Sequence, residues 1–484
     1  MVKPLLEPGS IFDGFRIDEA VHIGGMATLW RVSRPGMTMP MLMKVPKFAE
    51  GADPAAIVSF EMEQMILPRL SGIHVPKFVA AGDFAVQPYI VMECIAGKTL
   101  LPRLPDLPLP YAEVADIGIK IATALDDLHR QHVIHLDVKP SNILVRPTGE
   151  AVLIDFGLSH HDQLPDLMQE EFRLPFGTAP YMSPEQLLGI RNDPRSDLFA
   201  LGVLLYFFST GVRPFGESET LRGMRRRLWR DPVPPRRLRP DYPAWLQEIV
   251  LRCLESEPAW RYPTAAQLAF DLSNPSQVKL TRRSERMKRD PLTTVLRRRF
   301  NKDLTRSIAK PALAAQLSSA PIVAVAIDLT EGSADIKYAL RATAERILAT
   351  FPSARLACLN VLKQSRIALD FTLDEHGHNK QIDRLVALKY WAEPLKLADT
   401  HLTVHVIEAV DPAAAILEFA QVNRVDHILI GARQSSLLRK LLGSVSAQVA
   451  AEATCTVTVV RPSHIDEAEK PSAGDDPAPK ESAA

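Results

Sequence analysis

His135-Leu136-Asp137-Val138-Lys139-Pro140-Ser141-Asn142, followed by Asp155-Phe156-Gly157, is the stretch that decides the fold of the first half of the chain. Asp137 can accept a hydroxyl proton, and Asn142 and Asp155 can each offer a metal ion one oxygen ligand. Mg²⁺ takes a few protein oxygens and otherwise keeps water and nucleotide phosphates. One base beside two such ligands therefore predicts transfer of a phosphoryl group to an alcohol.

Other motifs extend outward from this stretch in a familiar order. A lone Asp-Phe-Gly would be an ordinary turn after a strand, so the order of the whole set carries the argument. With these motifs, residues 10–275 resemble a bacterial eukaryotic-type (Hanks-type) Ser/Thr protein kinase, a two-lobed α+β fold. The set consists of Met41-Leu42-Met43-Lys44, Phe60-Glu61-Met62-Glu63, Tyr89-Ile90-Val91-Met92-Glu93-Cys94, Ser183-Pro184-Glu185, Asp197 and Arg261.

The resemblance implies a role for each matching residue. Asp137 accepts or orients the substrate hydroxyl and Lys139 stabilises the transferring phosphate. The same resemblance implies ATP and Mg²⁺ as cofactors, Ser/Thr side chains of proteins as substrates, and an ion pair between Arg261 and Glu185. The implied cofactor residues are Asn142 and Asp155 for the metal, Lys44 and Glu63 for the ATP phosphates, Gly24 and Gly25 for the phosphate loop, and the backbone of Glu93 and Ile95 for adenine.

Two departures from the family pattern are informative. The glycine-rich pattern falls on His22, Gly24 and Ala27, so only the tip of the loop keeps its glycines, and we expect weaker ATP binding. The arginine that usually precedes the catalytic aspartate is Leu136, and residues 160–177 contain no Ser, Thr or Tyr. We therefore hypothesise that activation-loop phosphorylation does not switch this kinase, and we expect the loop acids to be solvated: Asp162, Asp166, Glu170 and Glu171.

Residues 276–320 are predicted to be a basic linker. They hold twelve basic and three acidic residues, a net charge of +9. Leu296, Phe300, Leu304 and Ile308 recur every four residues, which predicts a basic amphipathic helix. Two interpretations stay open: a solvated or packed interdomain helix, and contact with an anionic membrane surface or nucleic acid.

Residues 321–462 alternate apolar strands with helices, which predicts an α/β, Rossmann-like domain with five parallel strands. We expect helices over 333–350, 383–398, 412–423 and 440–452. Val323–Asp328, Ile430–Arg433, Leu442–Val445 and Cys455–Val460 resemble segments of the universal stress protein family. The expected strands are 322–327, 356–361, 402–407, 427–430 and 456–460.

The resemblance implies a second nucleotide site at Asp328, Gly431, Gly443 and Ser444, although the family's glycine motif is matched only in part. The alternative is that Gly443 forms a turn and Asp328 caps a helix. Family members often dimerise through the last strand, and the alternating segment at 456–460 is compatible with a homodimer. Residues 463–484, with a net charge of −4, predict a disordered tail.

Composition bounds the remaining possibilities. The chain has 57 Lys and Arg against 57 Asp and Glu, which argues against a dedicated nucleic-acid binder. Its four cysteines form no CxxC pair, and no signal peptide or apolar run long enough to span a membrane is present, so we expect a cytoplasmic protein without a transmembrane segment. Besides a kinase with a regulatory stress-sensing domain, a pseudokinase or nucleotide-binding scaffold with a dimeric stress module remains open.

Overall fold

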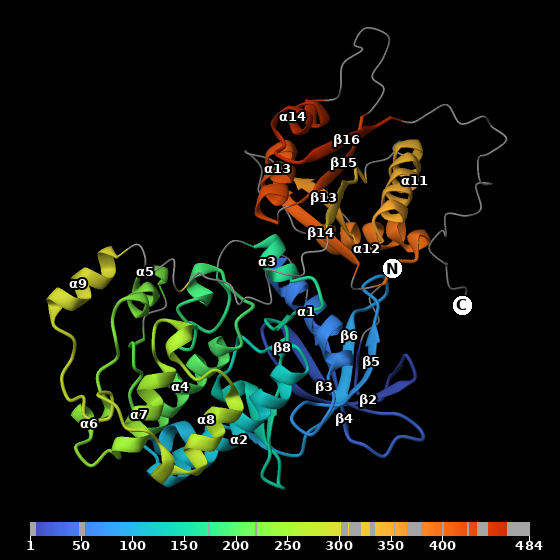
Figure 1. The fold of residues 1–484 in the computed structure, drawn as a ribbon. Helices are drawn as coiled ribbons and strands as arrows, with labels where there is room; N and C mark the ends of the chain where they lie inside the picture. The colour runs from blue at the N-terminus through green and yellow to red at the C-terminus, as the bar shows by residue number, and fades with distance from the viewer. Residues whose placement is uncertain are drawn as a thin grey trace. The chain divides into compact units, whose positions relative to one another are not determined.

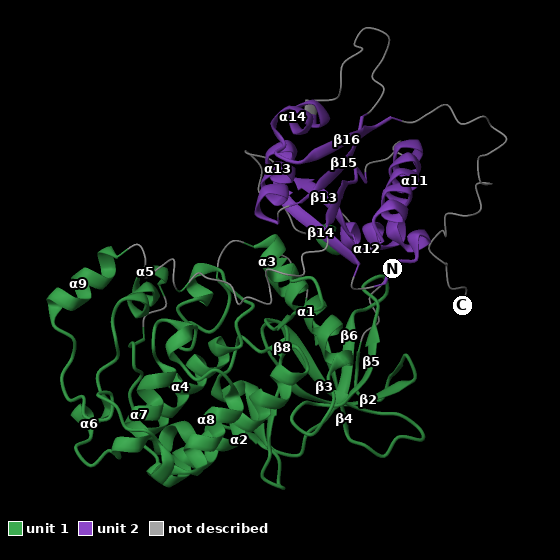
Figure 2. Ribbon diagram, viewed as in Figure 1, with its two compact units in different colours: residues 1–319, 371–382 green, residues 320–370, 383–484 purple. Residues whose placement is uncertain are grey.

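The computed structural model describes residues 6–47, 54–172, 175–217, 220–301, 308, 321–329, 334–352, 354–364, 379–398, 401–423, 425–432 and 444–461. The chain divides into two compact units, one of residues 1–319 with 371–382 and one of residues 320–370 with 383–484 (Figure 2). Among the described residues, no helix is both long and apolar enough to cross a membrane.

The first unit begins with an antiparallel sheet of six strands, backed by the helix α1 (Pro54–Ile66) (Figure 1). Alternation sends Phe15, Ile17, Met41 and Met43 to one buried face of this sheet. The strands, in sheet order, are β1 (Ile11–Phe12), β2 (Phe15–Ile23), β3 (Ala27–Ser33), β4 (Met41–Pro46), β6 (Tyr89–Glu93) and β5 (Phe78–Gly82).

Helices make up most of the rest of the first unit, as expected for the large lobe of the predicted fold. The central helix α4 (Arg195–Thr210) is buried along almost its whole length. It is flanked by α2 (Tyr111–Arg130) and α7 (Ala244–Cys253), and α2 also contacts α8 (Ala265–Ser273). The shorter helices are α3 (Leu167–Glu171), α5 (Leu221–Met224), α6 (Pro235–Leu238) and α9 (Leu292–Phe300).

Short strands hold the loops between α2 and α4. β7 (Lys98–Thr99), β9 (Ile143–Val145) and β10 (Ala151–Leu153) form one small antiparallel sheet. β8 (Val133–Ile134) pairs with β11 (His160–His161) in another. Because β8 and β9 lie on either side of residues 135–142, the segment that decides the fold is anchored at both ends.

The second unit is built on five parallel strands in the order β14-β13-β12-β15-β16, which confirms the predicted fold class. Helices α13 (Pro412–Val422) and α14 (Ser444–Glu452) pack together on one side, and α11 (Ala334–Thr350) lies on the other with α12 (Lys380–Ala392) (Figure 1). The strands are β12 (Ile322–Ala326), β13 (Arg355–Lys363), β14 (Leu402–Ala409), β15 (His427–Gly431) and β16 (Thr456–Val460).

Part of the predicted linker belongs to the first unit. The expected amphipathic helix is present as α9, which ends at Phe300. Leu304 lies outside the described residues, and Ile308 is buried. The segment before α9 is held to the large lobe by Gln247, which donates to the carbonyl oxygens of Arg283 and Arg286.

Candidate active site

The structure brings Lys44, Glu63 and Asp155 together. Lys44 lies between Met43 and Val45, whose side chains are buried on the far face of the sheet, so alternation turns Lys44 towards α1. Its Nζ donates to Glu63 Oε2 at 2.5 Å and to Asp155 Oδ1 at 3.0 Å. Burial alone would lower the pKa of Lys44, but the carboxylates of Asp155 and Glu63 outweigh burial and raise it. Lys44 therefore stays a cation, as binding of phosphate requires.

Asp197 fixes the shape of the catalytic loop. This carboxylate is fully buried at the start of α4 and accepts the backbone N–H groups of His135 and Leu136, each at 2.8 Å. It also contacts His129 Nε2 at 2.9 Å. Leu136 has a φ of +61°, which is strained for a branched side chain, and these hydrogen bonds hold the backbone in that conformation.

Asp137 is the centre of the loop's hydrogen bonds. Its Oδ2 accepts from Lys139 Nζ at 2.6 Å and from Asn142 Nδ2 at 3.0 Å. Its Oδ1 accepts from the hydroxyl of Thr178 at 2.7 Å, and the same hydroxyl accepts from Lys139 at 2.9 Å. The carboxylate is thus oriented by a cation, an amide and a hydroxyl, and it is only 5% exposed.

Asn142 and Asp155 have the donor chemistry of a Mg²⁺ site. The Asn142 amide nitrogen donates to Asp137, and its oxygen, which accepts from the Ser141 hydroxyl at 3.2 Å, is the atom with lone pairs for a metal. The Asp155 side chain is 46% exposed, and the nearby Lys44 lowers its pKa, so it is an accessible carboxylate. Within the described ranges no three His, Cys, Asp or Glu side chains form a metal cage. Two protein oxygens suit an ion that completes its shell with phosphate and water.

The expected adenine-binding segment lies at the end of β6. The Glu93 carboxylate forms a two-point ion pair with Arg146, at 2.6 and 3.1 Å, and these hydrogen bonds lower the pKa of Glu93. Arg146 also donates to the carbonyl of Ile73 at 3.2 Å. The N–H of Cys94 donates to Pro40 O at 2.8 Å and the N–H of Glu93 donates to Lys77 O at 2.9 Å, so both of these backbone N–H groups are paired within the lobe.

The loop with the incomplete glycine pattern is a tight turn between β2 and β3. Gly24 N–H donates to Ala27 O at 3.0 Å, and Lys47 Nζ donates to Gly24 O at 2.9 Å. A side chain at Gly24 would lie 3.2 Å from the His22 ring, whereas one at Gly25 would meet nothing within 4 Å. A side chain at position 25 would therefore have free space, whereas the His22 ring leaves little room for a side chain at Gly24.

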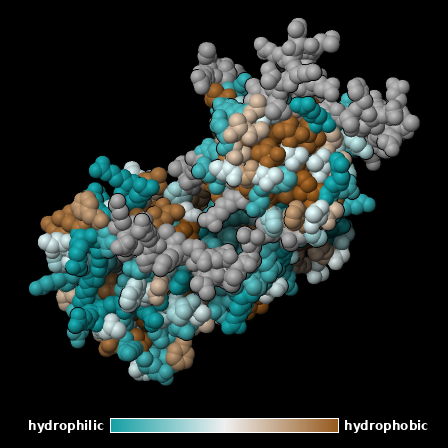
Figure 3. All heavy atoms as spheres, turned by 45° about the horizontal axis from the view of Figure 1, so that its top comes forward, coloured by the Kyte–Doolittle hydropathy of each residue, from teal (hydrophilic) through white to brown (hydrophobic). Residues whose placement is uncertain are grey.

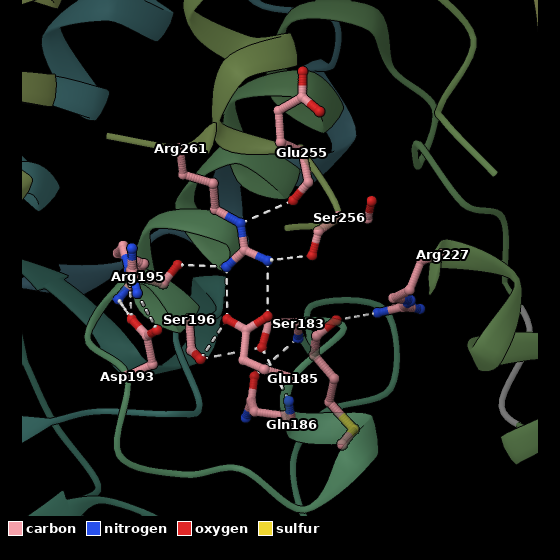
Figure 4. A network of polar contacts seen from close by, with 11 residues as sticks. Ser183, Glu185, Gln186, Asp193, Arg195, Ser196, Arg227, Glu255, Ser256 and Arg261 are labelled. Carbon is pink, nitrogen blue, oxygen red and sulfur yellow. Dashed lines mark hydrogen bonds and ion pairs between the residues drawn. The ribbon is translucent and has the colours of Figure 1, made fainter. Parts of the chain in front are cut away.

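The predicted pair of Glu185 and Arg261 is confirmed (Figure 4). Two parallel hydrogen bonds of 2.6 and 2.7 Å join the guanidinium to the carboxylate, and both side chains are at most 1% exposed. Arg261 also donates to the carbonyls of Arg195 and Glu255, and Ser196 donates to Glu185. This network ties the segment after the activation loop to the helices of the large lobe.

Asp166 was expected to be a solvated loop acid, and that expectation is wrong. It is only 7% exposed and accepts from Arg191 Nε at 2.7 Å, while His160 Nδ1 lies 3.0 Å away. Burial alone would raise the pKa of Asp166, but Arg191 and His160 outweigh burial and hold it well below its ordinary value. Asp166 also caps α3 by accepting the N–H of Gln169. The motif Asp-x-x-Gln is a weak signal for a helix N-cap, and the sequence analysis did not identify it.

A second residue that the sequence reading missed is Arg227. It is 3% exposed and donates to the carbonyls of Ala179 and Met182, on either side of Tyr181. Burial lowers its pKa to about 10. Arg227 stands in a run of three arginines, and nothing in that run distinguishes the buried one from its exposed neighbours.

In the second unit, two of the four residues expected to bind nucleotide lie at the carboxyl ends of two neighbouring central strands. Ala326 pairs with Ile430, so Asp328 and Gly431 follow at the same carboxyl end of β12 and β15. A Cβ on Gly431 would lie 2.4 Å from Ile336, so this glycine also serves the packing of α11. Gly443 lies outside the described residues, and of Ser444 only its place at the start of α14 is described.

Comparison with known proteins agrees with both units. The protein kinase domain model matches residues 38–271 and the universal stress protein family model matches residues 321–461. A probable serine/threonine-protein kinase of Clostridium perfringens is 30% identical over 282 residues, which cover 58% of this chain and 39% of the relative. The serine/threonine-protein kinase pkn3 of Myxococcus xanthus is 33% identical over 273 residues, which cover 53% of this chain and 49% of the relative.

A crystal structure of the PknI kinase domain of Mycobacterium tuberculosis is 26% identical, with a TM-score of 0.44, and the match covers 56% of this chain and 99% of that one. The chain spans less than half the length of the two curated relatives above. The motifs, the two folds and the family matches agree that the chain carries a protein kinase domain of the bacterial Ser/Thr type, followed by a domain of the universal stress protein family.

Proposed function

We propose that the protein transfers the γ-phosphate of ATP, with Mg²⁺, to serine and threonine hydroxyls of other proteins. The observation that carries this proposal is the arrangement around Asp137, where Lys139 and Thr178 share one hydrogen-bonded cluster with the carboxylate. A pseudokinase needs no such oriented base. The Lys44–Glu63 pair supports the proposal independently, because a lysine held by a helix glutamate is what binding of the ATP phosphates requires.

Each side chain then has a distinct task. Asp137 orients the acceptor hydroxyl and takes its proton, while Lys139 offers positive charge where the transferring group gains negative charge. Lys44 orients the ATP phosphates, and Asn142 and Asp155 would hold Mg²⁺, which neutralises phosphate charge when it is bound. Thr178 keeps Asp137 and Lys139 at a fixed spacing.

The test is transfer of labelled phosphate from ATP to the full chain itself and to a generic basic protein. Asp137→Asn keeps the shape of the side chain and removes the base, so we expect transfer to fall by about 100-fold or more. Asp116→Asn, an exposed pair partner on α2, is the matched control. Labelled phosphoserine or phosphothreonine supports the proposal. Transfer no greater than that of Asp137→Asn would contradict it and favour a pseudokinase scaffold.

We also propose that fixed charges order the activation segment without a phosphate. The Asp166–Arg191 pair and the contact with His160 stand in the segment that lacks any Ser, Thr or Tyr between 160 and 177. Arg191 further donates to the carbonyl of Leu158, close to the Asp-Phe-Gly motif. Thr178 is engaged by Asp137 and Lys139, which supports a structural rather than a switching role for its hydroxyl.

For the second unit we propose nucleotide binding that regulates the kinase. Asp328 follows β12 and Gly431 is the last residue of β15. The order of the parallel sheet reverses between these two strands, the place where such sheets bind ligands. The test is equilibrium dialysis of the full chain with ATP. We expect two sites per chain in the wild type and one in Asp328→Asn, with a changed phosphotransfer rate. Two sites in the variant would contradict the assignment.

We further propose a homodimer through β16. This strand pairs with β15 on one side and lies at the edge of the described sheet, which leaves its other side for a second copy. Sedimentation velocity is the test, and Thr456→Lys, at an exposed position of β16, should shift a dimer to monomer. An unchanged sedimentation coefficient would place any dimer contact elsewhere.

A further inference from the structure

The segment from 278 to α9 divides its side chains into two sets. Three arginines anchor this segment to the large lobe, because each of them forms ion pairs with partly or fully buried acids. Arg283 pairs with Glu248 and Glu255, Arg286 with Asp231 and Asp290, and Arg298 with the same Asp231 and Asp290. The pairs of Arg298 with Asp231 and Asp290 hold α9, whereas Leu292, Leu296, Arg297, Arg299 and Phe300 of the same helix are exposed.

The outward side of α9 is apolar. Leu292, Leu296 and Phe300, spaced four residues apart, form one row along the helix and are 74%, 49% and 76% exposed. The side facing the lobe carries Val295 and Arg298, which are partly buried. An exposed row of this kind on a surface helix marks a contact site, since covering it with an apolar partner is favourable.

Exposed positive charge surrounds this row. Arg297 and Arg299 are exposed on α9, and Arg299 lies over the Trp229 ring at 5.7 Å. That contact brings α9 beside residues 221–230, where four more arginines and the partly exposed Leu221 lie. Figure 3 shows apolar and hydrophilic side chains together at the end of the first unit that carries α9. The four arginines are Arg222, Arg225, Arg226 and Arg230.

We propose that this face, the α9 surface, binds an anionic lipid bilayer. Leu292, Leu296 and Phe300 enter the boundary between headgroups and acyl chains, and the arginines meet lipid phosphates. A helix with an apolar row and flanking basic residues is the combination that lies in a membrane interface. Nucleic acid would use the charges but leave the apolar row in water. Asp231 and Asp290, the acids that pair with Arg298 of α9, do not oppose this binding because Arg286 and Arg298 neutralise them.

The test is sedimentation of the full chain with phosphatidylcholine vesicles that contain phosphatidylglycerol, and with vesicles of phosphatidylcholine alone. We expect binding to the anionic vesicles that weakens as salt rises. Each arginine near the surface is worth about fivefold in affinity, and an inserted Phe adds to this, so Phe300→Gln/Arg297→Gln should weaken binding by tenfold or more, roughly. The matched control is Phe270→Gln/Arg130→Gln, at exposed positions on α8 and α2, and its binding should be unchanged.

Four results would overturn the proposal. One is equal binding by the two double variants, and a second is equal binding to neutral and anionic vesicles. Another is binding to duplex DNA without binding to vesicles, which would make nucleic acid the partner. The last is vesicle binding that appears only when residues 463–484 are deleted, which would make the acidic tail the occupant of the α9 surface. All four substituted side chains are exposed, so the thermal midpoint of both variants should match that of the wild type.

Discussion

At the scale of single residues, buried charge organises the kinase unit. Asp137, Asp166, Asp197 and Glu185 are each at most 7% exposed, and each is held by cations or N–H groups. A buried carboxylate without such partners would cost several kcal/mol, roughly, so each one depends on its partners. Arg261, the partner of Glu185, is the residue whose substitution tests this dependence most directly.

Arg261→Met should lower the free energy of unfolding of the first unit by about 3–5 kcal/mol, because Glu185 would remain buried without a countercharge. Arg130→Met, on the exposed side of α2, should change it by less than about 0.5 kcal/mol. Urea unfolding of the full chain measures both. A similar loss of unfolding free energy in the two variants would show that the buried ion pair contributes no more to stability than an exposed arginine does.

Asp166→Asn should destabilise the first unit by about 1–3 kcal/mol at neutral pH, because Arg191 loses its charged partner. Since the pKa of Asp166 is lower in the folded than in the unfolded chain, its stabilisation is complete above the unfolded pKa of about 4 and fades as pH falls below it. The gap between wild type and variant in urea unfolding should therefore stay wide from pH 7 down to about 4, and then shrink steadily as pH falls towards the much lower folded pKa of Asp166. A gap that stays constant would mean that the carboxylate is not held ionised.

At the scale of elements, the site depends on close contact between α1 and the Asp-Phe-Gly turn. A Cβ on Gly157 would lie 2.2 Å from Ser59 Oγ and 2.9 Å from the Ser59 carbonyl oxygen. Glu63 is on the same helix as Ser59, so the position of α1 sets the Lys44–Glu63 contact. Only a residue without a side chain at 157 lets the helix come this close.

Gly157→Ala should therefore reduce kcat, by about 100-fold if α1 moves by 1 Å, roughly the sensitivity of positioned catalytic groups. Ser59→Ala, which removes an atom from the same contact, should keep wild-type activity. Steady-state phosphotransfer measures the two variants, and circular dichroism checks that they are folded. Full activity of Gly157→Ala would show that the α1 contact does not position the site.

The elements also show where sequence patterns suffice. All five strands of the second unit were predictable, because buried parallel strands read as continuous apolar runs. The helix expected over 383–398 is wrong at both ends: α12 spans Lys380–Ala392, and Lys396 has a φ of +49°. Pro394 explains the early end, since proline has no N–H to donate to the carbonyl four residues back, and the chain continues as a 3-10 turn over Glu393–Leu395. Periodicity alone could not find Asp166 or Arg227, because their partners are distant in sequence.

At the scale of the whole molecule, the zero net charge conceals a strongly uneven distribution. The basic segment could be identified from the sequence, but its division into arginines that anchor α9 and arginines that face outward depends on Glu248, Asp231 and Asp290. Asp290 directly precedes α9 in the sequence, but Glu248 and Asp231 are distant along the chain, and it is the fold that brings Asp231 to Arg298. The motifs of the active site were predictable because their order is itself the signal, whereas the charges that brace them were not.

Two compact units with separate cores should unfold in separate transitions. Trp391, whose Nε1 donates to Lys337 O at 2.9 Å, is the only one of the five tryptophans in the second unit. Tryptophan fluorescence during urea unfolding should show two steps, and Trp391→Phe should remove the step of the second unit. A single unfolding step in the wild type, still present in Trp391→Phe, would mean that the two units unfold together.

The most direct test of the account is the rate of phosphate transfer by the full chain after complete dephosphorylation with a phosphatase that is then removed. If fixed charges already order the site, transfer to a protein substrate should begin at its full rate without a lag, and Asp137→Asn should abolish it. A lag that disappears once the chain has phosphorylated itself would contradict the account, and so would the absence of transfer by the wild type.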